Sequence, residues 1–323
     1  MDNAPAPQHH TIQGLMLALA GFATFSIGDG IVKSMAGQMT GTGVAFIRYA
    51  IGSIALSTIL FGVRGRAGFV LPKPGLQLAR AIAVSMASVG FFLGVQFMPL
   101  ANATSIQFTS PMLAAVLSAL ILKERAPAAV WVATAMAFTG VVIILRPQLL
   151  SVGWAAFYPV LAALGMAFLM IFNRMSSGVV PLLESQFLIS IIATPILALL
   201  AIALHLTGMP QFQLHMPTGL ILFKCACVAV TGTSSHWLIF MATQRASAAI
   251  TAPMMYVQLL TATVIGIVFF HAVPTQMTFV GAAVIVAGGL YLAHATRRAQ
   301  APAHHVETID EAVALSLSLG SPD

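Results

Sequence analysis

Long apolar runs constrain this chain more than any other feature. Turn residues and charges divide the sequence into ten such runs, at residues 12–35, 42–62, 77–97, 101–122, 128–146, 152–173, 184–206, 218–241, 247–270 and 276–294. A helix of about 20 apolar residues crosses a hydrocarbon core roughly 30 Å thick. We therefore predict an all-α membrane protein with ten transmembrane helices.

The composition excludes a soluble domain. Only 7% of the 323 residues are charged, whereas a soluble domain carries about 25% charged residues. The net charge of +6 would suggest a nucleic-acid partner in a soluble protein. Here the basic residues gather between the apolar runs, so we expect the lipid bilayer, and no nucleic acid, as the partner.

The basic residues also predict the orientation in the membrane. With the N-terminus inside, inner loops and the C-terminal tail hold Arg64, Arg66, Lys73, Arg80, Lys123, Arg125, Arg174, Arg245, Arg297 and Arg298. The outer side holds Lys33 and Arg146, and only Arg48 and Lys224 fall within spans. Since cytoplasmic loops are enriched in Lys and Arg, we expect both termini in the cytoplasm of a bacterial inner membrane. The tails are residues 1–11 and 299–323, and the polar second tail is expected to be disordered.

The two halves of the chain resemble each other. The segment "ATSIQFTSPMLAAVLSALILKERAP" (103–127) aligns with "ITAPMMYVQLLTATVIGIVFFHAVP" (250–274), which matches Thr104 with Thr251 and Pro127 with Pro274. Five spans per half is an odd number, so the second half would be inverted in the membrane. We predict two inverted five-helix repeats, at residues 12–147 and 152–294, an organisation typical of secondary transporters.

Residues 12–294 resemble the drug/metabolite transporter superfamily, EamA branch. The resemblance rests on "DGIVK" at the end of the first span, "FIRY" in the second, "LKERAP" after the fourth, "APMMYVQLL" in the ninth and "GAAVIVAGGLYL" in the tenth. It implies ten helices in two inverted repeats and transport of small polar or amphipathic metabolites. It also implies a cavity lined mainly by the third, fourth, eighth and ninth helices, with the first and sixth contributing.

Four charged residues are predicted to share one layer in the outer half of the membrane. They are Asp29, Lys33, Arg48 and Lys224. Charges at this depth face protein or water, because exposure to lipid costs at least a few kcal/mol each. One interpretation is structural: Asp29 pairs with Lys33 or Arg48, or Lys33 extends to the headgroups. The other is functional: the surplus positive charge binds an anionic substrate group through Arg48, or Asp29 carries a proton.

Other polar and aromatic residues of the spans are further candidates for substrate contacts. Since such side chains also serve helix packing or bond to their own backbone, both roles stay open for Ser88, Phe92, Gln107, His236, Trp237, Tyr256 and Gln258. Pro111 and Pro253 are hinge candidates or static kinks. Small residues suit close helix contact, within the chain or across a homodimer: Gly281, Ala282, Gly288 and Gly289.

Functional classes other than transport lack support in the sequence. It contains no HExxH, GxSxG, paired-aspartate or Walker A motif, so we expect neither an enzyme nor direct use of ATP. A Schiff-base receptor on Lys224 disagrees with ten spans, and a channel lacks a filter-like loop. Cys225 and Cys227 are expected to be reduced thiols. We therefore expect a secondary transporter of small metabolites or drugs, anionic or zwitterionic and amino-acid-like, without metal or cofactor.

Overall fold

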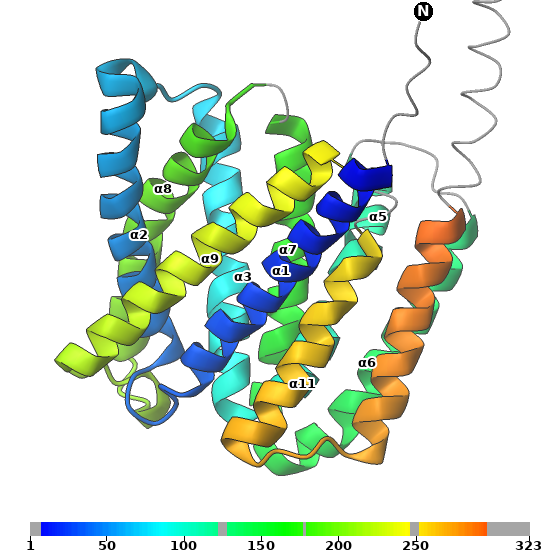
Figure 1. Cartoon of the computed structure of the whole chain (residues 1–323). Helices are drawn as coiled ribbons and strands as arrows, with labels where there is room; N and C mark the ends of the chain where they lie inside the picture. The colour runs from blue at the N-terminus through cyan, green and yellow to red at the C-terminus, as the bar shows by residue number, and fades with distance from the viewer. Residues whose placement is uncertain (1–7, 122–127, 177–178, 246–251, 296–323) are drawn as a thin grey trace, which may run out of the picture.

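A computed structural model describes residues 8–121, 128–176, 179–245 and 252–295, and every regular element within these ranges is a helix (Figure 1). The α-helices are α1 (Gln8–Lys33), α2 (Gly41–Arg64), α3 (Pro74–Phe97), α4 (Leu100–Gln107), α5 (Ser110–Ile121), α6 (Ala128–Val152), α7 (Tyr158–Ser176), α8 (Leu182–His205), α9 (Gly219–Arg245), α11 (Tyr256–Phe270) and a last helix, Gln276–Ala295. Short 3-10 turns are η1 (Gly65–Gly68), η2 (Gly153–Phe157), η3 (Pro210–Phe212) and η4 (Ala252–Met255).

Eight helical stretches of the described chain are long and apolar enough to cross a membrane. One of them, Ala128–Ser176, has 49 residues and contains both α6 and α7 with η2 between them. A further apolar helix, α11, is shorter, with 15 residues. The prediction of an all-α membrane protein is confirmed.

Two predicted boundaries differ from the observed helices. The fifth apolar run was expected to end at residue 146, but α6 continues through Pro147 to Val152. The next residue, Gly153, has a φ of +60°, a backbone conformation that suits glycine and ends the α-helix. The fourth run is divided, because α4 ends at Gln107 and α5 begins at Ser110. The predicted tail 299–323 lies outside the described residues, whereas part of the predicted tail 1–11 belongs to α1.

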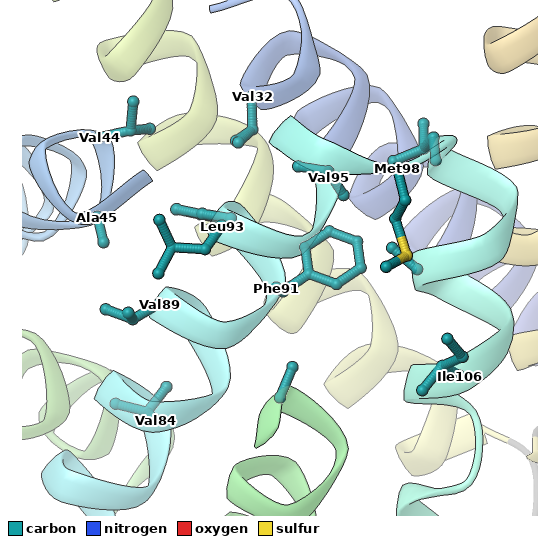
Figure 2. Close-up of a cluster of buried hydrophobic side chains, with 14 of the residues drawn as sticks. Val32, Val44, Ala45, Val84, Val89, Phe91, Leu93, Val95, Met98 and Ile106 are labelled. Atoms are coloured by element: carbon teal, nitrogen blue, oxygen red, sulfur yellow. The ribbon is translucent and has the colours of Figure 1, made fainter. Parts of the chain in front are cut away.

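The helices of the two halves are interleaved. Helix α1 packs against α9 and α11, and α7 packs against α3 and α5. Helix α2 contacts α8 and α9, and α3 also contacts α8. Figure 2 shows how α3 supplies much of the apolar core, with Val84, Val89, Phe91, Leu93 and Val95 meeting side chains of α1, α2 and α4.

Glycines let α3 and α7 approach at backbone distance. A methyl group added to Gly165 would lie 2.5 Å from the amide nitrogen of Ala87, and one added to Gly90 would lie 2.7 Å from the carbonyl oxygen of Tyr158. Because lipid supplies no hydrophobic drive between helices, close contact of small residues is a main source of stability in a membrane.

Glycines of the last helix pack within the chain. A methyl group on Gly281 would lie 2.7 Å from the carbonyl oxygen of Gly140, and one on Gly288 would lie 3.1 Å from that of Ala133. Both neighbours belong to α6. For these two glycines the close contact within the chain is thus observed, and a homodimer stays a prediction.

The described chain begins and ends at the same end of the molecule. Helix α1 starts there and the last helix returns there (Figure 1). We call this the terminal end, and the opposite end, which holds the connection between α1 and α2, the far end. Helices α3 and α8 begin at the terminal end and α7 ends there.

Candidate functional site

A polar cavity of about 70 Å³ lies among α2, α3, α7, α8 and α9. It is large enough for several water molecules. Its polar wall consists of Arg48, Tyr49, Asn173, Gln186, Ser190, Thr233 and His236.

Arg48 carries the charge of this wall. Its guanidinium carbon lies 4.8 Å from the centre of the Tyr49 ring and 5.5 Å from that of Phe92, so two aromatic faces stabilise the cation. A methyl group on Gly232 would lie 2.8 Å from Nη2, so the glycine of α9 makes room for the guanidinium. Within the described ranges, no ion pair joins Arg48 to a carboxylate. The cation therefore faces the cavity without a countercharge in contact.

Ser88 and Phe92 support the cavity wall from α3. The hydroxyl groups of Ser88 and Tyr49 lie 3.1 Å apart and share a hydrogen bond. Both side chains are buried. Ser88 therefore orients Tyr49, and Phe92 provides a face for Arg48, while neither belongs to the cavity lining.

Asp29 joins α1 to α11. Its Oδ2 accepts a hydrogen bond of 3.1 Å from Nε2 of Gln258, and Ser26 Oγ donates to the backbone carbonyl of Gln258 at 2.6 Å. No salt bridge joins Asp29 to Lys33 or Arg48 in the described part of the chain, so the expected direct ion pair is wrong, although the charge of Arg48 acts on Asp29 through space. Asp29 and Gln258 instead connect helices from the two halves.

Lys33 caps α3 at the far end. Its Nζ donates to the carbonyl oxygens of Val95, at 2.5 Å, and Met98, at 2.9 Å. The last carbonyls of a helix lack intrahelical partners and attract cations, which explains why the ammonium lies there. Lys224 has a related position, since its Nζ donates to the carbonyl oxygen of Ser34 at 3.4 Å. Neither lysine lines the cavity.

The remaining predicted contacts are scattered. The His236 ring packs edge-on against Phe25 at 5.0 Å and forms part of the wall. Trp237, the next residue of α9, is 47% exposed and lies outside the lining. Tyr256 packs edge-on against Phe108 at 5.7 Å, and Gln107 ends α4 without reaching the cavity.

The two hinge candidates lie next to irregular backbone. Pro111 is the second residue of α5, directly after the break from α4. At this position its missing N–H costs no helical hydrogen bond. Pro253 lies in η4, just before α11.

Sequence reasoning missed Arg80. It was assigned to an inner loop, but it lies in α3 and is 3% exposed. Its guanidinium donates to the side-chain oxygens of Asn173 at 2.9 Å, Gln77 at 2.6 Å, Ser185 at 2.6 Å and Ser176 at 3.4 Å. We call these five residues the Arg80 cluster. The signal in the sequence was Gln77, three residues before Arg80 on the same helix face.

The described side chains point to solute binding. They contain no group of three or more His, Cys, Asp or Glu residues that could hold a metal ion. Cys225 and Cys227 are free thiols. A small polar cavity with a cation in its wall and aromatic faces beside it can bind a polar solute.

Comparison with known proteins identifies the family. The profile of the EamA-like transporter family matches residues 12–146 and again residues 153–293. The chain belongs to this family. A solved crystal structure has the same fold, with a TM-score of 0.56 and 19% identity, covering 90% of this chain and 98% of its own.

Relatives of this EamA-like transporter carry different cargo. The S-adenosylmethionine uptake transporter of Rickettsia prowazekii is 24% identical over 91% of this chain and 96% of its own length. The riboflavin transporter of Vibrio cholerae is 29% identical over 86% and 92%. The pseudopaline exporter CntI of Pseudomonas aeruginosa is 29% identical over 42% and 46%. The protein is thus a small-molecule membrane transporter and not an enzyme.

Proposed function

We propose that this EamA-like transporter moves small anionic or zwitterionic metabolites, such as amino-acid-like compounds, across the bacterial inner membrane by alternating access. Arg48 binds the anionic group of the cargo. The observation that carries this proposal is the guanidinium of Arg48 in the cavity wall, with aromatic faces beside it and no carboxylate in contact within the described residues.

The charge balance of the described chain supports an anionic group on the cargo. These ranges contain ten lysines and arginines but only two carboxylates, Asp29 and Glu184. Asp29 accepts from Gln258, and Glu184 lies 3.4 Å from Arg64. Neither carboxylate is in contact with Arg48. S-adenosylmethionine, the cargo named for the rickettsial relatives, is an amino-acid derivative, so a carboxylate-binding arginine is compatible with such a molecule.

The proposal includes ten membrane-spanning segments in two inverted repeats, at residues 12–147 and 152–294. Helix contacts support it, because exchanging the halves converts the α1–α9 contact into α7–α3, α1–α11 into α7–α5, and α2–α9 into α8–α3, all of which are observed. Helices α1 and α7 also run in opposite directions (Figure 1).

Two further observations support the repeat. The family profile matches each half separately. The irregular turns also correspond. Helix α5 begins at Ser110 after the break from α4, and α11 begins at Tyr256 after η4. Tyr256 aligns with Thr109, so the two helices begin at nearly the same place in the repeat. A unit and its inverse give inward- and outward-open states of similar energy.

Both termini are proposed to lie in the cytoplasm. The shared terminal end of α1 and the last helix supports their being on one side. Lys and Arg are more frequent in the loops at the terminal end, which supports placing that end on the cytoplasmic side.

Replacing Arg48 with Gln tests the function. A thermal-shift screen of purified protein against a metabolite library first identifies a cargo, since a ligand of the native state raises apparent stability. Uptake of that compound into proteoliposomes is expected to fall at least tenfold in Arg48→Gln, with unchanged expression and folding. Arg48→Lys should be intermediate, because it keeps the charge but loses the planar fork.

The matched control is Arg66→Gln, which removes an exposed cation from η1 and should transport normally. Unimpaired uptake of an anionic or zwitterionic cargo by Arg48→Gln would reject the proposed binding role.

A further inference from the structure

We propose that the Arg80 cluster is a second anion-binding site of the cavity, which receives the carboxylate or phosphate group of the cargo between Arg48 and the terminal end. This inference rests on the proposed function and extends it. It concerns Arg80 together with Gln77, Asn173, Ser176 and Ser185.

The first argument is that the Arg80 charge is buried among neutral groups. All four side-chain acceptors are amide or hydroxyl oxygens. In the described ranges no carboxylate contacts the guanidinium, since Glu184 pairs with Arg64 instead. A buried ion without a countercharge is costly even when it is hydrogen-bonded. An anion that reaches the cluster would therefore be bound strongly.

The second argument is access from the cavity. Asn173 accepts a hydrogen bond from Arg80 Nε, and it also lines the cavity whose wall contains Arg48. The Asn173 side chain is exposed, unlike Arg80 and Gln77 behind it. A solute in the cavity thus meets an amide that is one hydrogen bond away from the guanidinium. A carboxylate or phosphate oxygen that displaces the Asn173 oxygen would keep that donor satisfied and add the missing charge.

The third argument is position. Helices α3 and α8 begin, and α7 ends, at the terminal end (Figure 1), and the Arg80 cluster joins these three helix ends. Arg48, by contrast, lies in α2 nearer the far end, seven residues after the start of the helix at Gly41. The two cations therefore lie at different depths between the far end and the terminal end.

A purely structural role for Arg80, as a brace of three helices, makes a different prediction. Gln77→Glu separates the two. Gln77 is 1% exposed and lies outside the cavity lining, and glutamate has nearly the same shape. The carboxylate would keep the bond from Arg80 and neutralise its charge from behind, while the 3.3 Å hydrogen bond from Gln77 Nε2 to the Pro72 carbonyl oxygen would be lost. A brace would be unchanged or strengthened, whereas an anion site would be weakened.

The experiment measures thermal unfolding of the purified full-length protein in sodium phosphate, sodium acetate and sodium chloride at equal ionic strength. We expect phosphate or acetate to stabilise the wild type above chloride, with an apparent affinity at least tenfold weaker in Gln77→Glu. Asn173→Asp, at an exposed position, should have the same effect and serves if Gln77→Glu does not fold. Ser151→Ala, at an exposed position outside the cluster, also removes one side-chain hydrogen bond and adds no charge, and it should keep the affinity of the wild type.

Either of two results would overturn the second site. One is a wild type that neither phosphate nor acetate stabilises above chloride. The other is Gln77→Glu or Asn173→Asp that folds and binds these anions as the wild type does. The proposed function is judged separately, by cargo uptake in Arg48→Gln. Normal uptake in Arg48→Gln together with weakened anion binding in Gln77→Glu would reject the Arg48 role and leave the Arg80 site standing.

Discussion

Lys33 shows how a charged side chain inside a membrane protein finds partners far along the chain. The spacing of Asp29 and Lys33, four residues apart on one helix, allowed a local ion pair as one of several interpretations. The carbonyls that Lys33 binds are 62 and 65 residues away in the sequence. Spacing within one helix cannot reveal them, because the end of α3 reaches Lys33 only through tertiary packing.

Removing the Lys33 ammonium should therefore affect stability. Lys33→Met keeps the length of the side chain but leaves two helix-end carbonyls without their donor. We expect a loss of about 1.5–3 kcal/mol in the free energy of unfolding, the range for hydrogen bonds that involve a charged group. Thermal or denaturant unfolding in detergent measures it. Arg66→Met, at an exposed loop position, is the control, and equal stability of both variants would contradict the capping role.

A polar or aromatic residue within a span is a candidate for substrate contact, but the sequence does not say whether its side chain faces the cavity. Arg48 and His236 lie in the cavity wall, whereas Trp237, one residue further along α9, is exposed. Adjacent positions on a helix are about 100° apart, so the distinction depends on which neighbours pack on which face. Arg80 escaped notice for the opposite reason, since its place near the start of α3 resembled a loop position.

At the scale of elements, apolar runs predict where helices lie, but they predict the ends and interruptions of helices poorly. The run 42–62 corresponds to α2, and the run 276–294 to the last helix. The run 128–146 was expected to end just before Pro147, but Pro147 lies inside α6. The division between α4 and α5 has no charge or glycine, but Pro111 follows it directly, and proline disfavours helical backbone in the residue before it.

The contact of α3 with α7 gives a prediction at this scale. Gly165→Val would place carbon atoms against the backbone of Ala87 and Ala83, so the helices would have to move apart. Overpacking of this kind costs about 1–3 kcal/mol or more. We expect a lower unfolding temperature and reduced transport in proteoliposomes. Gly62→Ala, where the structure has open space, is the control, and a Gly165→Val protein as stable as this control would refute the close packing.

At the scale of the whole molecule, the sequence alone was enough for the class and the family. Low charge content and ten apolar runs predicted an all-helical membrane protein, and the quoted motifs pointed to the EamA branch. Both are confirmed. The position of the cavity could not be derived in this way, because it lies among helices of both halves, whose relative placement no single segment encodes.

The proposed orientation is testable on the intact chain. A reporter domain that is active only in the cytoplasm should be active when it is inserted after Arg66 or after Ala295. A reporter that is active only in the periplasm should be active when it is inserted after Gly208. This follows from the distribution of Lys and Arg and from the shared end of α1 and the last helix. Opposite locations for the reporters after Arg66 and Ala295 would contradict two inverted five-helix units.

The small volume of the cavity limits how tightly cargo can be held. About 70 Å³ is well below the roughly 300–1,000 Å³ of sites that enclose a drug-sized ligand. A molecule as large as a flavin can enter only after the surrounding helices separate, and the energy of separating them reduces the observed affinity. A compound small enough to fit the closed cavity avoids this cost, so the closed form favours small solutes over large ones.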